Sequence, residues 1–375
     1  MTSSPDTAPA VDPKVLRAAR LSQLFAHVPD PRKARGKRHP LPVILALAVA
    51  AVASGARSVY AITEHATDVG SELLRALGVG HSVPSEATLR RVIETLDAEV
   101  FSLICGAWLR LRATTSAGRL VIALDGKTVR GARESDARAP HLVAAFTHGD
   151  GLTLAQTQVD AKTNEIPAAQ HLLGLMDLEG VVVTMDAIHT QTTTATQVID
   201  QQGDYVLTVK SNQPRLHQAM KALPWRDIPS VSQVEVSHGR RVRRTTQAVS
   251  APAWIEFPGA QQIVKVRRTR TIDGKKTIEV VYLISSIPMR DAQPEVIASW
   301  IQSHWHIENR LHWVRDVTFD EDRQHLRTGT GPAMMAALRN LAISLHRLTG
   351  ATNIAKALRH TARNVRRAIK LLLTT

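Results

Sequence analysis

Cysteine is almost absent from this sequence, and so are long apolar segments. Cys105 is the only cysteine among the 375 residues, which excludes an internal disulfide and a zinc site built from several thiolates. The longest apolar run covers residues 41–55 and is interrupted by Pro42 and Ser54. It falls short of the roughly 20 residues that span a bilayer. We therefore expect a buried helix here and no membrane partner.

The sequence also lacks targeting signals and repeats. Residues 1–13 are polar and contain no apolar core of the kind found in signal peptides. No self-similar repeat of the length that builds solenoids is visible. These features predict a disordered tail over residues 1–13 and a cytoplasmic protein, nucleoid-associated if its partner is DNA.

Acidic residues are too few to balance the basic ones. Lysine and arginine number 47 against 33 aspartates and glutamates, so 47 − 33 gives a net charge of +14. This excess favours a polyanionic partner such as nucleic acid, although an enzyme that is basic for unrelated reasons is the alternative. Residues 32–38 carry five positive charges and are either a solvated loop or an arm that contacts DNA.

The first third of the chain has helical patterns. We expect a helical N-terminal domain over residues 14–117, with helices at 41–54, 58–76 and 85–96. Ser85 follows a proline and is the expected N-cap of the third helix.

The pattern changes to buried strands after residue 118. Residues 119–125 form a short apolar run that ends in Asp125, and residues 181–186 form a similar run that ends in Asp186. Between them we expect a hairpin over residues 141–159 and a helix over 166–176, capped by Asn164 or Thr163. A helix at 193–202 and a strand at 204–209 are expected to follow.

The remaining segments are an insertion and the C-terminal helices. Residues 212–284 are expected to form a β-rich insertion with a hairpin around Asp273-Gly274 and many basic side chains. Its Trp225 and Trp254 could stack on a flipped base, although core packing is the simpler expectation. A helix should begin at Pro294 and run to about residue 314. Residues 350–375 should form one basic amphipathic helix.

This order of elements is typical of a ribonuclease H-like domain, which we expect over residues 118–349. The first and fourth strands of such a domain are neighbours, so Asp125 and Asp186 would converge. A carboxylate on a late helix could complete a site for Mg²⁺, which prefers oxygen ligands. Glu308 lies beside an apolar stripe and between histidines, but Asp316, Asp320, Glu321 and Asp322 are close rivals. Each aspartate could instead be only a turn former or a helix cap.

Several blocks of sequence resemble one known family. Residues 304–322, HWHIENRLHWVRDVTFDED, resemble the HWxIENxLHWVxDVxFxED block of a bacterial insertion-sequence transposase family that includes the H-repeat-associated proteins. Further blocks agree in order: LDGKTVRG at 124–131, KTNEIP at 162–167, DAIHTQ at 186–191 and GDYVLTVK at 203–210. Residues 30–39 and 84–91 resemble the N-terminal domain associated with that family.

The resemblance implies a DDE transposase with Asp125, Asp186 and Glu308 as catalytic and metal-binding residues. It implies two Mg²⁺ ions, with Mn²⁺ as a substitute, and strand cleavage and transfer at the ends of an insertion sequence. DNA would be the partner, with a homodimer assembled on it. Further positions become candidates for supporting the site or contacting DNA: Lys127, Lys162, Asn164, Glu165, His189, Lys210, Asn212, Arg240, Arg244, His304, Asn309, His312 and Arg315.

Two departures from the family pattern keep other functions open. Gln302 stands where the family usually has arginine, and Val242 stands where a glutamate is expected. A transposase-derived protein that binds DNA without cutting it is therefore one alternative. A ribonuclease H-like nuclease that never joins strands is another.

Overall fold

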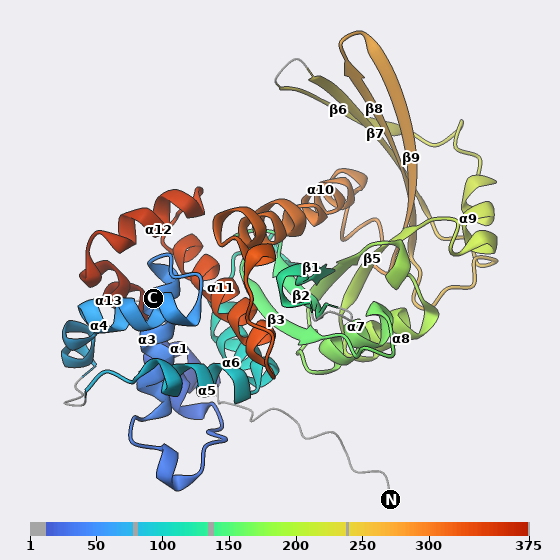
Figure 1. The fold of residues 1–375 in the computed structure, drawn as a ribbon. Coiled ribbons are helices and arrows are strands. Elements are labelled where there is room, and N and C mark those ends of the chain that lie inside the picture. The colour runs from blue at the N-terminus through green and yellow to red at the C-terminus, as the bar shows by residue number, and fades with distance from the viewer. Residues whose placement is uncertain (1–12, 78–81, 134–138, 238–239, 374–375) are drawn as a thin grey trace, which may run out of the picture. The chain divides into compact units, whose positions relative to one another are not determined.

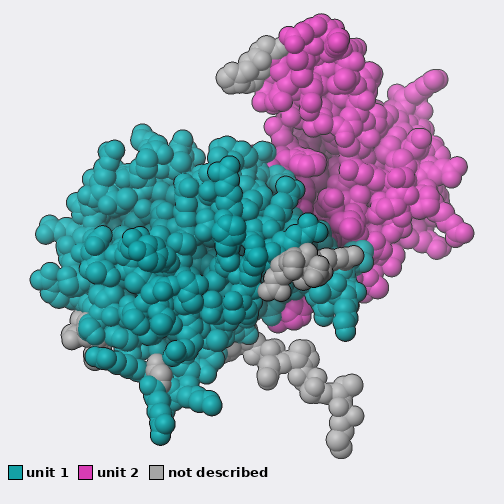
Figure 2. Space-filling model, viewed as in Figure 1, with its two compact units in different colours: residues 1–114, 126–168, 307–375 teal, residues 115–125, 169–306 magenta. Residues whose placement is uncertain are grey.

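The computed structural model describes residues 13–77, 82–133, 139–237 and 240–373, and the chain divides into two compact units. Unit 1 comprises residues 1–114, 126–168 and 307–375, and unit 2 comprises residues 115–125 and 169–306 (Figures 1 and 2). The tail expected over residues 1–13 lies outside the described residues, except that Pro13 begins a helix.

The N-terminal part of unit 1 is helical, as the sequence predicts. Helix α3 is buried along almost its whole length, which explains why its sequence is apolar on all sides. Helix α4 is amphipathic, and the Ser58 side chain caps it by accepting a hydrogen bond from the Ala61 amide. The elements of this part are α1 (Pro13–Ala18), α2 (Leu21–Leu24), η1 (Phe25–His27), η2 (Ala34–Gly36), α3 (Leu41–Ala53), α4 (Val59–Ala76), α5 (Glu86–Thr95) and α6 (Ala98–Arg110).

The expected cap of α5 is only partly correct. Ser85 occupies the N-cap position, but its hydroxyl does not cap a backbone amide. It lies 3.2 Å from the Thr88 hydroxyl instead. The position of the helix start was therefore predictable, whereas the hydrogen bond that satisfies Ser85 was not.

The rest of unit 1 surrounds helix α11 (Gly331–Leu348). This helix packs against α3, α5, α6 and strand β3, and most of its side chains are buried (Figure 1). Strand β3 (Thr153–Gln158) pairs with β2 (His141–Thr147) as the expected antiparallel hairpin. Short turns complete the unit: η3 (Arg130–Ala132), η5 (Glu308–His312), η6 (Val314–Thr318) and η7 (Glu321–Arg323).

The C-terminal segment differs from its prediction. The expected single helix over residues 350–375 is two helices, α12 (Ile354–Ala362) and α13 (Val365–Leu373). The Asn364 side chain accepts a hydrogen bond from the Arg366 amide, so it ends one helix and caps the next. Amphipathic spacing continues across this break, which is why the pattern alone did not reveal it.

Unit 2 contains the parallel strands that the sequence predicts. Strand β1 (Leu120–Thr128) pairs in parallel with β4 (Val181–Met185), and β4 pairs in parallel with β5 (Asp204–Val209). The first and fourth strands are thus neighbours, as expected for a ribonuclease H-like domain. Helices α7 (Glu165–Gly174) and α8 (Thr192–Asp200) and the turn η4 (Ala187–His189) connect these strands.

The insertion is β-rich, as predicted, and extends the same sheet. It begins with helix α9 (Pro214–Lys221), and strand β9 (Lys275–Ser285) pairs antiparallel with β5. The strand order is β3-β2-β1-β4-β5-β9-β8-β7-β6. The β8–β9 turn has positive φ at Asp273 and Gly274, which fits the predicted hairpin. The other insertion strands are β6 (Ser230–Ser237), β7 (Arg240–Ser250) and β8 (Gln262–Ile272).

Helix α10 (Pro294–His304) closes the core of unit 2. Ile297 and Trp300 on this helix pack against a sheet face that includes Val121, Val206 and Leu283. The helix is shorter than expected, because π-helical turns follow it from Glu308. No helix among the described residues is long and apolar enough to cross a membrane.

Candidate active site

Asp125 and Asp186 follow two strands that lie side by side in unit 2. Leu124 of β1 is paired in register with Met185 of β4. Asp125 and Asp186 are the next residues on these parallel strands, so both carboxylates belong to the same edge of the sheet. Both are partly buried. This placement agrees with the geometric argument made from the sequence.

Asp186 also has a local structural role. Its Oδ1 accepts a hydrogen bond from the Ile188 amide at 3.0 Å and caps η4. The capping alternative raised from the sequence is therefore real. A carboxylate can accept about four hydrogen bonds or metal contacts, so this cap leaves Oδ2 for another ligand.

Glu308 and His312 form a pair in unit 1. The Glu308 Oε2 atom lies 3.3 Å from Nδ1 of His312, and their side chains are 50% and 4% exposed, respectively. Burial lowers the pKa of His312, and the hydrogen bond with Glu308 opposes this shift. A half-exposed carboxylate is thus held by a buried imidazole one turn away.

Carboxylate ligands for a metal ion are present in both units. In unit 2, Asp125 and Asp186 lie at the same edge of the sheet, and in unit 1 Glu308 is a half-exposed carboxylate beside His312. Carboxylate oxygens suit Mg²⁺ or Mn²⁺, whereas a ring nitrogen is a less typical ligand for Mg²⁺. The donor set therefore fits a divalent ion held by the carboxylates.

Asp316, one rival for the third carboxylate, already has a partner. Its Oδ1 and Oδ2 atoms lie 2.6 and 2.7 Å from Nζ of Lys127. The Lys127 side chain is only 8% exposed, so the carboxylate neutralises a nearly buried ammonium group. Lys127 thus forms an ion pair that holds the end of β1 against η6.

Glu321, a second rival, is buried between two arginines. Arg315 binds it with two guanidinium nitrogens, and Arg339 donates at 2.8 Å. Burial raises the pKa of Glu321, but the two arginines lower it more strongly, to about 2. Arg315 was a candidate for supporting the site or contacting DNA; its side chain is completely buried against Glu321, which fits the supporting role better.

The last two rivals are less suited to a metal. Asp320 has positive φ and weak ion pairs with Arg57 and Arg323 at 3.9 and 3.7 Å. Asp322 is partly buried in η7 and belongs to no metal-binding group among the described residues. Glu308 therefore stays our prediction for the third carboxylate.

A histidine that the sequence did not single out lies next to the catalytic strand. His141 Nε2 lies 2.8 Å from the Glu165 carboxylate, and its Nδ1 lies 2.8 Å from the Thr128 hydroxyl. A Cβ atom on Gly126 would overlap this pair, at 2.6 Å from Cδ of Glu165. A larger residue at position 126 would therefore have to displace the Glu165 or His141 side chain. His141 begins a hairpin strand and carried no motif that could have identified it.

The other candidates have mostly local partners. Asn164 caps α7 through the Ile166 amide at 3.0 Å, as predicted, while Thr163 does not. His304 Nδ1 lies 3.0 Å from the Thr184 hydroxyl inside unit 2. The Asn212 side chain donates to the Ala187 carbonyl. His189 is buried, whereas six candidates are exposed: Lys162, Asn164, Lys210, Asn212, Arg240 and Asn309.

The insertion residues discussed from the sequence have contrasting environments. Trp225 is buried and donates to the Met220 carbonyl, so it is a core residue, while Trp254 is 59% exposed. Arg244 pairs with Glu235 at 3.0 Å. Val242, which stands where the family pattern has glutamate, is only 2% exposed, so its side chain is part of the packing of β7. Gln302 is exposed on α10.

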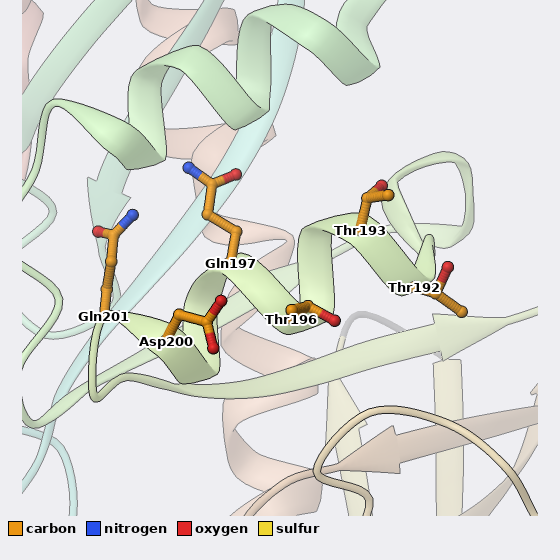
Figure 3. A pocket seen from close by; sticks show the side chains of 6 residues that line it. All are labelled: Thr192, Thr193, Thr196, Gln197, Asp200 and Gln201. Atoms are coloured by element: carbon orange, nitrogen blue, oxygen red, sulfur yellow. The ribbon is translucent and has the colours of Figure 1, made fainter.

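A separate hollow lies along helix α8. It measures about 390 Å³ and is lined by threonine and glutamine side chains with one carboxylate, Asp200 (Figure 3). A single carboxylate among hydroxyl and amide groups provides too little charge for the proposed metal chemistry. We assign it no catalytic role.

Comparison with known proteins identifies the family of this chain. A family model described as a transposase DDE domain matches residues 116–345. The chain belongs to this family. A second model, described as DDE_Tnp_1-associated, matches residues 22–109. The first match contains Asp125, Asp186 and Glu308, so all three carboxylates belong to the DDE domain.

Two relatives of this transposase chain are bacterial proteins that carry the word transposase in their names. YncI of Escherichia coli O157:H7 is 32% identical over 337 residues, which cover 85% of both chains. The H repeat-associated YhhI of Escherichia coli strain K12 is 32% identical over 346 residues, or 87% of this chain and 90% of YhhI. The resemblance inferred from the sequence blocks is thereby confirmed.

Proposed function

We propose that this protein binds the ends of an insertion sequence and catalyses metal-dependent DNA strand cleavage and strand transfer. The observation that carries the proposal is the placement of Asp125 and Asp186 at the ends of two paired parallel strands, in a chain that belongs to the DDE transposase family. Oxygen ligands at two adjacent strand ends and on a helix are the donor set that divalent-metal phosphoryl transfer requires.

Each residue has a defined part in this proposal. Asp125, Asp186 and Glu308 would hold two Mg²⁺ ions, and His312 would orient Glu308. When bound, the ions supply stabilisation of the charge that develops on the attacking and leaving oxygens. The Lys127–Asp316 pair would keep the end of β1 fixed against η6, so that Asp125 is preorganised.

The reaction would proceed in two phosphoryl transfers. Water attacks the phosphorus at the end of the element, the P–O3′ bond breaks, and a free 3′-hydroxyl results. That hydroxyl then attacks a phosphodiester of target DNA, forming a new P–O bond while the target strand leaves with its own 3′-hydroxyl. Both steps need the same in-line geometry, so one site can serve both. A homodimer assembled on DNA would bring two ends together.

A reconstituted reaction tests the proposal. Purified protein, DNA carrying the candidate inverted repeats and a target plasmid are incubated with Mg²⁺, with Mn²⁺, or with a chelator. We expect strand cleavage and joined products with either metal and none with the chelator. Binding without cleavage would indicate a DNA-binding descendant, and cleavage without joining would indicate a nuclease.

A further inference from the structure

The four insertion strands β6 to β9 form a sheet whose two faces carry different charge. Successive residues of a strand point to opposite faces, and directly paired residues of antiparallel neighbours share a face. The register pairs Arg243 with Val234 and Thr269, whereas Arg244 pairs with Gln233 and Arg268. The face that contains Arg243 is called the cationic face below, and the other is the compensated face.

The compensated face contains the acidic residues of these strands. By register, Glu235 and Glu279 lie on it together with Arg244 and Arg268. Glu235 pairs with Arg244 at 3.0 Å, and Glu279 pairs with Arg268 at 2.5 Å. Its five cations are therefore offset by two carboxylates, which leaves 5 − 2, or three, positive charges. The five cations are Arg240, Arg244, Arg268, Arg270 and Lys275.

The cationic face has the same number of cations and no carboxylate from these strands. The register places on it Arg241, Arg243, Lys265, Arg267 and Lys276. The contacts described for two of them are with neutral groups: Arg243 donates to the Ser232 hydroxyl, and Lys265 lies over the Trp225 ring. Arg241, Arg267 and Lys276 are exposed. No carboxylate of these strands thus offsets the five positive charges of this face.

Exposed aliphatic side chains flank these cations, on strands β6 and β9 at either side of β7 and β8. Val234 and Val236 of β6 are 51% and 71% exposed, and Ile278 and Val280 of β9 are 50% and 41% exposed. Pairing puts all four on the cationic face. Exposed apolar groups collected in one place usually mark a binding surface. The cationic faces of two copies of this chain would repel each other, because both are positively charged. The complementary partner is therefore a polyanion that also carries apolar groups.

We propose that the cationic face of β6 to β9 binds duplex DNA. Arg241, Arg243 and Arg267 would contact backbone phosphates, while the valines and isoleucines would contact sugars and thymine methyl groups. This inference rests on the proposed function, because it assigns the DNA contact of the insertion to one face. It also moves that contact away from Arg240 and Arg244, which the sequence had favoured.

A matched pair of triple variants of the full-length protein tests the assignment. One variant carries Arg241→Gln, Arg243→Gln and Arg267→Gln on the cationic face. The control carries Arg268→Gln, Arg270→Gln and Lys275→Gln on the compensated face. Affinity for an inverted-repeat duplex is measured by fluorescence anisotropy between 50 and 200 mM salt. Three lost phosphate contacts should reduce the slope of log K against log salt by about 2.7, at 0.9 per contact. The control should change it by much less.

A second variant distinguishes the loss of DNA contacts from misfolding of the sheet. Val236→Thr with Ile278→Thr keeps β-branched side chains at exposed positions, so the fold should be retained. It should weaken binding while leaving the salt slope unchanged, because no charge is removed.

Each remaining outcome opposes the proposal. Equal slope changes in both triple variants would show that the faces do not differ. Unchanged binding in both, with wild-type cleavage intact, would remove this surface from DNA binding but leave the proposed function standing. A shift in oligomeric state instead of DNA affinity would make the face a contact between copies. Failure of the wild-type protein to bind any DNA would overturn this inference and the proposed function together.

Discussion

Lys127 and Asp316 are joined by a short ion pair, with Nζ lying 2.6 Å from Oδ1. The pair connects residues 189 positions apart, so tertiary structure alone creates it. Because Lys127 is nearly buried, its ammonium group would lose water without gaining a partner if Asp316 were absent. Asp316 is therefore needed as a counter-ion, which makes it a weaker candidate for a metal ligand than Glu308.

We predict that Asp316→Asn lowers the free energy of unfolding by about 1.5–3 kcal/mol, the usual loss for a hydrogen bond to a charged group. Adding Lys127→Met should recover part of that loss, because the variant no longer buries an unpaired cation. Urea unfolding of both single variants and the double variant measures the coupling. Strictly additive losses would show that the pair contributes nothing to stability.

The three carboxylates should be required for chemistry and not for binding. Asp125→Asn, Asp186→Asn and Glu308→Gln each remove charge that attracts the metal while keeping side-chain size. We expect cleavage and joining to be lost in each variant, with affinity for end DNA within a few-fold of wild type. Affinity comes mainly from lysine and arginine contacts with phosphates. Gel assays of cleavage and anisotropy of binding on the same preparations separate the two effects.

Asp320→Asn is the matched control for these variants. It also removes one carboxylate from the same segment, and asparagine tolerates the positive φ of 55° at this position. Activity should persist. An inactive Asp320→Asn beside a fully active Glu308→Gln would transfer the third ligand to another carboxylate of residues 316–322.

The placement of Asp125 and Asp186 on neighbouring strands could be predicted because it depends on local patterns. A buried strand followed by aspartate occurs twice, and the order of the intervening elements makes those strands neighbours. Glu308 followed from the amphipathic pattern of its segment and from the block around it. The hairpin at Asp273-Gly274 was also local, since its turn needs positive φ at both central residues.

The parts that escaped prediction depend on contacts between distant residues. Glu321 looked like a possible ligand because nothing in its neighbourhood indicates that Arg339 reaches it. His141 meets Glu165 and Thr128 only after the hairpin has folded. The π-helical turns after Glu308 shift the spacing assumed for a regular α-helix. Asn364 divides the last helix by a side-chain cap within an unbroken amphipathic pattern.

The contact between helix α6 and strand β3 provides a stability test. A Cβ atom on Gly106 would overlap the backbone carbonyl of Leu154, which cannot rotate away as a side chain could. We predict that Gly106→Ala destabilises the protein by about 1–3 kcal/mol, the usual cost of overpacking a core. In Gly174→Ala the new methyl would meet only the end of Gln197, at 3.3 Å, so thermal unfolding should be nearly unchanged. Equal melting temperatures for both variants would contradict the tight helix–strand contact.

Glu321 should make the protein sensitive to acid. Burial raises its pKa, but Arg315 and Arg339 lower it further, to about 2, compared with about 4.3 for an unfolded glutamate. A carboxylate with a lowered pKa stabilises the fold fully above the unfolded value, and this contribution disappears as the pH falls toward the folded value. We therefore expect the loss between about pH 4.3 and pH 2.

The measurement compares Glu321→Gln with wild type by urea unfolding from pH 6 down to pH 2.5. At pH 6 the variant leaves two buried arginines without their counter-ion, so it should be less stable by about 3–5 kcal/mol. Below pH 4 the difference should shrink, because the unfolded wild-type glutamate takes up a proton there while the folded Glu321 stays ionised until about pH 2. Glu279→Gln, which removes a surface partner of Arg268, should cost at most about 1 kcal/mol. A difference for Glu321→Gln that stays constant across this pH range would mean that the carboxylate is not held ionised by the two arginines.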